Sequence, residues 1–197
     1  MSAAVLFAVV EPAVAETVPP TEDDLGDVFT RARGGDDAAF AELYRRFARA
    51  VHGIVLARTG PADAEDLVQE VFASVHRALS SVRDARALPA WIRSVAVNAA
   101  VDRLRRRAKG PRRVPLLDTA CRPPPDADGE RELRERVLAR LLELPEAHRE
   151  PLVLRLVEGL SGPEIARLTG MTPASVRVNL CRGLALLRPL IAKDGFR

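Results

Sequence analysis

A proline-rich segment, residues 110–129, separates two stretches of the chain in which apolar side chains recur every three or four positions. The segment itself has no helical period and holds five prolines: Pro111, Pro115, Pro123, Pro124 and Pro125. Proline has no backbone N–H and cannot continue a helix, so a run of this composition is typical of a linker. The chain is therefore predicted to fold as two units, residues 28–109 and 130–192, on either side of this linker.

Both units are predicted to be helical. Apolar residues make up 47% of the chain but aromatic residues only 4%, so the core must consist mainly of Leu, Val and Ala, which favours helices over sheets. In the first unit, Gly60-Pro61 and a polar loop at 80–87 divide three amphipathic runs, and Trp91 and Leu104 are expected to point inward from the third. The expected fold class is all-α, with two small domains: an N-terminal helical bundle and a C-terminal helix-turn-helix domain.

Residues 161–188, SGPEIARLTGMTPASVRVNLCRGLALLR, match a helix-turn-helix motif position by position. Ser161 is a suitable N-cap for the first helix, with Glu164 three residues later to complete a capping box. Gly170 permits a left-handed turn, and Thr172 can cap the second helix. In this motif the second helix enters the major groove of DNA. The side chains expected to face the groove are Arg177, Val178, Cys181 and Arg182.

Charge is distributed unevenly along a chain whose formal net charge is +3. The stretch PADAEDLVQEVF, residues 61–72, carries four carboxylates and no basic residue, whereas VDRLRRRAKGPRR, residues 101–113, is strongly basic. A basic run of this kind contacts nucleic-acid phosphates. On a helix, four side chains of the acidic stretch share one outward face: Asp63, Asp66, Gln69 and Glu70. That face predicts a second, basic partner, although solvated acidic faces are also ordinary on helices.

The sequence gives no indication of an enzyme, a metal site or a disulfide framework. Cys121 and Cys181 are sixty residues apart, without a CxxC motif or a neighbouring histidine cluster, which fits plain thiols in a reducing cytosol. The three histidines are scattered, no glycine-rich phosphate loop occurs, and no nucleophile–base pair stands out. We therefore expect a cytoplasmic protein with no catalytic activity, no cofactor, no bound metal and no small-molecule substrate.

Residues 1–27 form an acidic leader in this interpretation. The start, MSAAVLFAVVEPAVAETVPP, has the short apolar run of a signal peptide but no positively charged n-region, because the first basic residue of the chain is Arg31. The apolar run is also far too short to span a bilayer. We expect this leader to be disordered, or to result from a translation start assigned too early.

The order of these motifs resembles the extracytoplasmic-function sigma factors of bacterial RNA polymerase. The resemblance is carried by DAEDLVQEVF, then LPAWIRSVAVNAAVDRLRRR, a proline-rich linker and the C-terminal helix-turn-helix, and it covers roughly residues 28–190. It implies a subunit that directs core polymerase to a specific set of promoters and initiates transcription there. The implied partners are promoter DNA, an anti-sigma factor, and core polymerase through its flap and the clamp helices of its largest subunit. The alternative is a stand-alone helix-turn-helix regulator of transcription.

Carried over by position, the resemblance assigns a role to each charged surface. Residues 28–109 correspond to sigma region 2, whose acidic helix would contact the polymerase clamp through Asp63, Glu65, Asp66, Gln69 and Glu70. The third helix of this domain would recognise and melt the minus-ten element through Asn98, Arg103, Arg105, Arg106, Arg107 and Lys109. Residues 130–192 correspond to region 4, whose recognition helix would bind the minus-thirty-five element through Thr172, Ser175, Arg177, Val178, Asn179, Cys181 and Arg182.

The recognition helix departs from the usual pattern of the family. Val178 and Asn179 stand where a small residue and an arginine are usual, and Gly183 stands where an alanine is expected, at some cost in helix propensity. Arg177 and Arg182 can still bond guanine edges or phosphates. Duplex binding is therefore expected, with a target sequence that differs from the common one. The linker could imitate a nucleic-acid strand in the polymerase cleft or act as a flexible tether, and its composition fits both.

Overall fold

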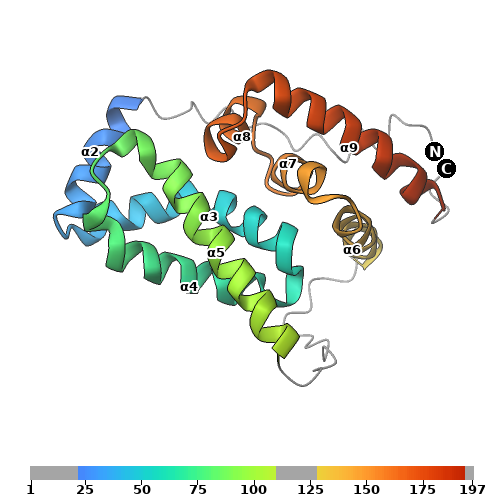
Figure 1. Ribbon diagram of the computed structural model, residues 1–197, viewed down its shortest axis with the longest axis horizontal. Coiled ribbons are helices and arrows are strands. Elements are labelled where there is room, and N and C mark those ends of the chain that lie inside the picture. Colours follow the sequence, from blue (N-terminus) through green and yellow to red (C-terminus); the bar gives the residue numbers. More distant parts are fainter. Residues whose placement is uncertain (1–21, 110–127, 194–197) are drawn as a thin grey trace.

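The computed structural model describes residues 22–109 and 128–193, and all regular secondary structure in these ranges is helical (Figure 1). The all-α prediction is confirmed. The first 21 residues and all but the last two residues of the expected linker, Cys121 among them, lie outside the described residues. Within the described ranges, no helix combines the length and the apolar composition that crossing a membrane requires.

The N-terminal domain is a bundle of helices joined by short 3-10 turns. The helices are α2 (Glu22–Arg33), α3 (Asp37–Thr59), α4 (Ala64–Ala78) and α5 (Leu88–Lys109). The turns are η1 (Pro61–Asp63), η2 (Leu79–Ser81) and η3 (Ala85–Ala87). Asp36 caps α3, since its Oδ1 accepts hydrogen bonds from the backbone N–H groups of Ala38 and Ala39. Gly60 ends α3 with a φ of 77°, a conformation that favours glycine.

Helix α2 begins at Glu22, inside the segment predicted to be a disordered leader. Val28, Phe29 and Ala32 are buried, and α2 packs against α3. Leu25 continues the same three-and-four spacing and also packs against the core. The expectation of disorder is therefore wrong for residues 22–27, which begin an amphipathic helix despite their acidic composition.

Helix α5 packs on α3 and α4 through one narrow buried stripe. The residues of this stripe follow one another at four-residue spacing: Leu88, Ile92, Ala96 and Ala100. Trp91 is half-buried and packs against the core, as predicted. Leu104 is 41% exposed, so the prediction that it points inward is wrong. The buried stripe ends at Ala100, and the next turns of the helix carry ion pairs instead.

The C-terminal domain consists of α6 (Asp128–Leu142), α7 (Glu146–Leu156), α8 (Gly162–Thr169) and α9 (Pro173–Lys193). Helices α8 and α9 form the predicted helix-turn-helix. Ser161 Oγ accepts from the N–H of Glu164, and the Glu164 carboxylate accepts from the N–H of Ser161, which completes the capping box. Gly170 is left-handed with a φ of 71°, and Thr172 Oγ1 accepts from the N–H of Ser175. These local contacts fix where the two helices begin and end.

The two domains pack against each other (Figure 1). Helix α7 lies against α3, and α8 lies against α5. The two domains approach closely at Gly53 of α3, where a Cβ atom would be 2.7 Å from Glu158 Cγ and 2.8 Å from Leu154 Cδ2. The absence of a side chain at Gly53 therefore allows the C-terminal domain to approach α3 this closely.

Candidate functional site

The exposed acidic surface of α4 is smaller than predicted. One side of the helix is buried through Leu67, Val68, Val71 and Phe72. The opposite side exposes Glu65, Asp66, Gln69 and Glu70. Asp63, the fifth predicted residue, is only 9% exposed, because it lies in the turn before α4 beside the C-terminal turns of α5. The expectation that Asp63 belongs to an outward face is therefore wrong.

Asp63 and Glu70 are paired with arginines that were predicted to contact DNA. Arg103 Nη1 donates to Asp63 Oδ1 over 3.0 Å, and its Nη2 donates to Glu70 Oε1 over 2.5 Å. Arg107 Nη1 lies 2.9 Å from Asp63 Oδ2, and Arg106 Nη2 lies 3.7 Å from Glu70 Oε2. The side chain of Arg103 is 20% exposed, so it ties α5 to α4 and offers little surface to a phosphate.

Two carboxylates of α4 remain available to a partner. Glu65 and Asp66 are exposed and make no ion pair or side-chain hydrogen bond with any described residue. A hollow of about 450 Å³ lies beside Glu65, between α3, α4 and the segment that follows α7. Its walls are formed by Tyr44, Ala48, Arg49, His52, Glu65, Val68, Gln69 and Glu158. Glu65 and Gln69, which are both predicted to face polymerase, therefore line one hollow together with Glu158 of the C-terminal domain.

The predicted minus-ten surface lies on the C-terminal half of α5. Asn98 is exposed, about two turns before the arginine run. Arg105, Arg106 and Arg107 are exposed as well, and Arg105 lies 3.5 Å from Asp102. The side chain of Lys109 falls outside the described part of the chain. Three guanidinium groups therefore stand at the surface here, where they can contact phosphates.

The recognition helix α9 exposes four of the side chains predicted to face DNA: Arg177, Val178, Cys181 and Arg182. Neither arginine is paired with a described residue. Thr172 and Ser175 are exposed at the start of the helix, where their hydroxyl groups bond to each other over 2.9 Å. Asn179 is half-buried, and its Nδ2 donates to Met171 Sδ over 3.6 Å. Asn179 is therefore held against the preceding turn, apart from the exposed reading face.

Gly183 lies where α9 packs on α7. From the sequence, this glycine was expected only to lower the helix propensity of α9. A Cβ atom at this position would be 2.6 Å from Leu152 Cδ1 and 3.2 Å from His148 Cβ. Carbon atoms in favourable contact are about 3.5–4.0 Å apart, so a methyl group would overlap with Leu152. Glycine therefore permits the close packing that seats the recognition helix on its domain.

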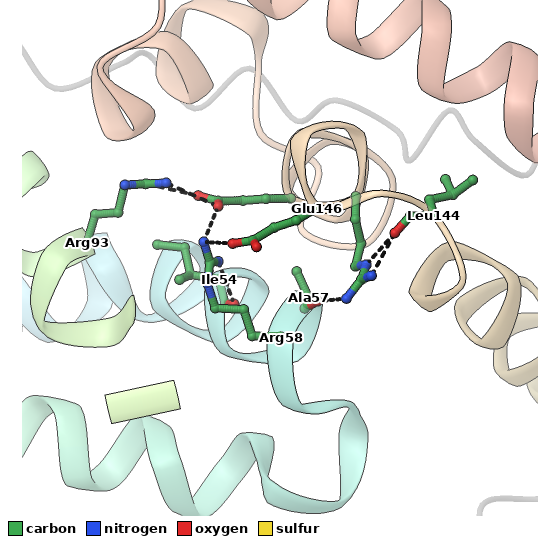
Figure 2. A network of polar contacts seen from close by, with 8 residues as sticks. Ile54, Ala57, Arg58, Arg93, Leu144 and Glu146 are labelled. Atoms are coloured by element: carbon green, nitrogen blue, oxygen red, sulfur yellow. Dashed lines mark hydrogen bonds and ion pairs between the residues drawn. The ribbon is translucent and has the colours of Figure 1, made fainter. Parts of the chain in front are cut away.

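Ion pairs between the two domains were not predicted from the sequence (Figure 2). Glu150 of α7 accepts hydrogen bonds from Arg58 of α3 and Arg93 of α5. Glu158, after α7, pairs with His52 of α3. The partners are between 57 and 106 positions apart in the chain, so no local pattern could reveal them. In the described ranges, no cluster of His, Cys, Asp and Glu side chains is arranged to hold a metal ion.

Comparison with protein-family models assigns both domains. Residues 43–110 match the model described as Sigma-70 region 2, and residues 134–187 match the model described as Sigma-70, region 4. The first match covers α4, α5 and most of α3. The second covers α7, α8 and the part of α9 up to Leu187.

Proteins similar to this chain carry the names of sigma factors. RNA polymerase sigma factor CarQ of Myxococcus xanthus is 36% identical, over 83% of this chain and 95% of CarQ. ECF RNA polymerase sigma factor SigM of Mycobacterium tuberculosis is 34% identical, over 80% of this chain and 79% of SigM. Among solved structures, CnrH in complex with the cytosolic domain of CnrY is similar with a TM-score of 0.61 and 25% identity, over 87% of this chain and 99% of that chain.

The two sigma regions occur in the order that the motifs indicated, each on its own helical domain. A match to region 2 as well as to region 4 favours a polymerase subunit over a stand-alone regulator. Sigma factors initiate transcription and are not enzymes. With both regions matched and relatives of about one-third identity spanning most of its length, this chain belongs to the extracytoplasmic-function sigma factors, which direct RNA polymerase to specific promoters.

Proposed function

We propose that this sigma factor binds core RNA polymerase through the exposed side of α4. The side chains involved are Glu65, Asp66, Gln69 and Glu70, and they meet the basic clamp helices of the largest subunit. The supporting observation is that Glu65 and Asp66 are exposed carboxylates with no ion-pair partner among the described residues. Opposite charges on two such surfaces speed their encounter and fix their register. Glu70 lies at the edge of this surface, where it is shared with Arg103 and Arg106.

The two DNA-binding surfaces then engage the two promoter elements. Helix α5 binds the minus-ten element through Asn98, Arg105, Arg106 and Arg107, and the arginines supply contacts to phosphates. Helix α9 binds the minus-thirty-five element while this DNA is double-stranded. The reading face of α9 consists of Arg177, Val178, Cys181 and Arg182. The two arginines on that face have the geometry to bond guanine edges. Thr172 and Ser175 mark the end of α9 that enters the groove.

An anti-sigma factor is the third proposed partner, and it holds the free protein inactive. The similar structure of CnrH contains a second protein, the cytosolic domain of CnrY. In this chain the surfaces for polymerase and for DNA are distributed over both domains, so an inhibitor that contacts both would block all of them. The protein acts in the cytoplasm, where polymerase and promoter DNA meet, and region 4 also docks on the polymerase flap.

A charge reversal on α4 tests the polymerase surface. Asp66→Lys should weaken binding to core polymerase by about tenfold or more, because it places a like charge against a basic helix. Asp37→Lys is the matched control, since Asp37 is an exposed carboxylate on α3 and should leave the affinity unchanged. Binding is measured with purified core polymerase, and start sites are mapped with the reconstituted enzyme. Equal affinities of Asp66→Lys and wild type would refute the proposed surface.

A further inference from the structure

Two apolar side chains lie between two arginines on the outer face of α9. Figure 1 shows α9 at the outer edge of the molecule, where it packs on α6, α7 and α8. Val178 is 44% exposed, and Cys181 is exposed beside it. Successive residues of a helix are rotated by about 100°, so Arg177, Cys181, Val178 and Arg182 follow one another around the helix within an arc of about 140°. The reading face therefore has an apolar centre with a cation on each side.

The other polar side chains near this face are already engaged. Asn179 Nδ2 donates to Met171 Sδ over 3.6 Å, and Asn179 is half-buried. The hydroxyl groups of Thr172 and Ser175 bond to each other over 2.9 Å, and Thr172 Oγ1 also accepts from the N–H of Ser175. None of the 21 residues of α9 is an aspartate or a glutamate. The reading face thus offers guanidinium donors and apolar atoms to DNA, without a carboxylate or an available side-chain amide.

These groups suit two of the four bases in the major groove. Guanine presents two acceptors there, O6 and N7, which match the paired donors of an arginine. Adenine is best matched by an asparagine or glutamine amide, and the amino group of cytosine needs an acceptor such as a carboxylate. Thymine is the base that carries a methyl group on this edge. A polar edge placed against Val178 would lose its water without a new hydrogen bond, whereas the thymine methyl group would be buried favourably. The apolar centre therefore favours thymine.

The spacing of these side chains along α9 fits three successive base pairs. Arg177 and Arg182 are five residues apart in the chain, which is about 7.5 Å along the helix axis. Base pairs are stacked about 3.4 Å apart, so a helix that lies along the groove places the two arginines about two base-pair steps apart. Val178 and Cys181 are at intermediate heights, about 1.5 and 6 Å from Arg177. Their side chains therefore meet the base pair between the two that the arginines reach.

We propose that the reading face of α9 recognises an A·T pair through the methyl group of its thymine, with a G·C pair on either side. Val178 and Cys181 contact the methyl group, and Arg177 and Arg182 each donate hydrogen bonds to a guanine. Val178 disfavours the other bases at the central pair, because it would leave their polar edges unpaired. This inference rests on the proposed binding of α9 to the minus-thirty-five element, and it specifies which bases that element contains.

Selection with the reconstituted polymerase holoenzyme tests the base sequence. Promoters with a randomised minus-thirty-five region are sorted by binding, and we expect the bound set to share a thymine flanked by G·C pairs. Deoxyuridine then replaces that thymidine, which removes the methyl group and keeps every hydrogen-bonding group. The affinity of the wild-type holoenzyme should fall about three- to tenfold, because one methyl group is no longer buried against Val178 and Cys181.

Substitution of Val178 tests whether this side chain reads the methyl group. The Val178→Ala variant should bind the thymine and uracil promoters with affinities within about twofold of each other, because it lacks both methyl groups of the valine. Leu186→Ala is the matched control and should keep the wild-type ratio, since Leu186 is also 44% exposed but lies about 12 Å further along α9. Each ratio compares two promoters bound by one protein, so a loss of stability in a variant cancels.

Three results would overturn the proposal: a selected element without a thymine between G·C pairs, equal binding of the thymine and uracil promoters by the wild type, or a wild-type ratio in Val178→Ala. A double variant, Arg177→Ala with Arg182→Ala, separates this inference from the proposed function. If the double variant still requires the same minus-thirty-five sequence, α9 does not read the element and its proposed function is wrong. If it loses that requirement while uracil has no effect on the wild type, only the thymine contact is wrong.

Discussion

Replacing Gly183 by alanine should destabilise the C-terminal domain, although alanine is the better helix former. Gly183 is on α9 where that helix meets α7, and a Cβ atom would lie 2.6 Å from Leu152 Cδ1, 3.1 Å from Leu152 Cγ and 3.2 Å from His148 Cβ. Leu152 is fully buried, so its side chain has no free space to enter. The Cβ of His148 can move only with the backbone of α7. The two helices must therefore move apart to admit the methyl group.

Two opposing effects set the size of this change. Overpacking a well-packed core by one methyl group costs about 1–3 kcal/mol, and the absence of space around Leu152 argues for the upper part of that range. The gain in helix propensity from glycine to alanine is about 1 kcal/mol. We expect a net loss of about 1–2 kcal/mol in the free energy of unfolding of the C-terminal domain. Ala185→Gly, two residues further on at an exposed position, measures the propensity effect alone and should cost about 1 kcal/mol.

Urea denaturation of the full-length protein measures both variants. A fluorophore on Cys181, which is exposed on α9, reports the transition in which this helix is released. The Gly183→Ala transition should move to lower urea concentration, with its slope unchanged. If Gly183→Ala is as stable as the wild type, or more stable, the close packing of α9 on α7 described here is wrong.

Two further predictions concern the contact between His52 and Glu158 and the reading face of α9. The hydrogen bond with Glu158 raises the pKa of His52. The charges of Glu158 and Glu65 add to this effect, and partial burial opposes it. The folded protein therefore favours the protonated form of His52, so the stabilisation from this contact is present below the ordinary histidine pKa and is lost as pH rises through the raised value. The free energy of unfolding, measured by urea denaturation, should therefore decrease as the pH rises above about 6.5, and a His52→Gln variant that keeps this pH dependence would contradict the assignment. Arg177→Ala should weaken minus-thirty-five binding roughly 5- to 100-fold and relax base preference there, as measured by a sequence-resolved assay with the reconstituted enzyme, whereas an equal loss on all sequences would indicate a phosphate contact.

Local signals made the helix-turn-helix predictable from sequence. The capping hydrogen bonds of Ser161, Gly170 and Thr172 join groups that are at most four positions apart in the chain. Their effect on the backbone therefore does not depend on the rest of the fold. Helix α2 was not predicted, because six acidic residues near the N-terminus are typical of disordered segments, although Leu25, Val28 and Phe29 follow a helical spacing.

The candidate site was predictable only in part. Periodicity identified the exposed side of α4 correctly for Asp66, Gln69 and Glu70, because a helix that buries one side must expose the other. It failed for Asp63, since the ion pairs of this residue come from α5, 40 or more positions away. Which carboxylate meets which guanidinium depends on where two helices cross, and that is decided by packing.

The sequence by itself determined that this protein has two helical domains with a proline-rich linker, an acidic helix and a helix-turn-helix, because caps, breaks and periodicity act over a few residues. Only the tertiary structure decided that Arg103 holds α5 against α4, that Gly183 must lack a side chain, and that Glu150 joins the domains. These three outcomes depend on distances between segments that are remote in the chain, and such distances are set by how the apolar faces of the helices pack together.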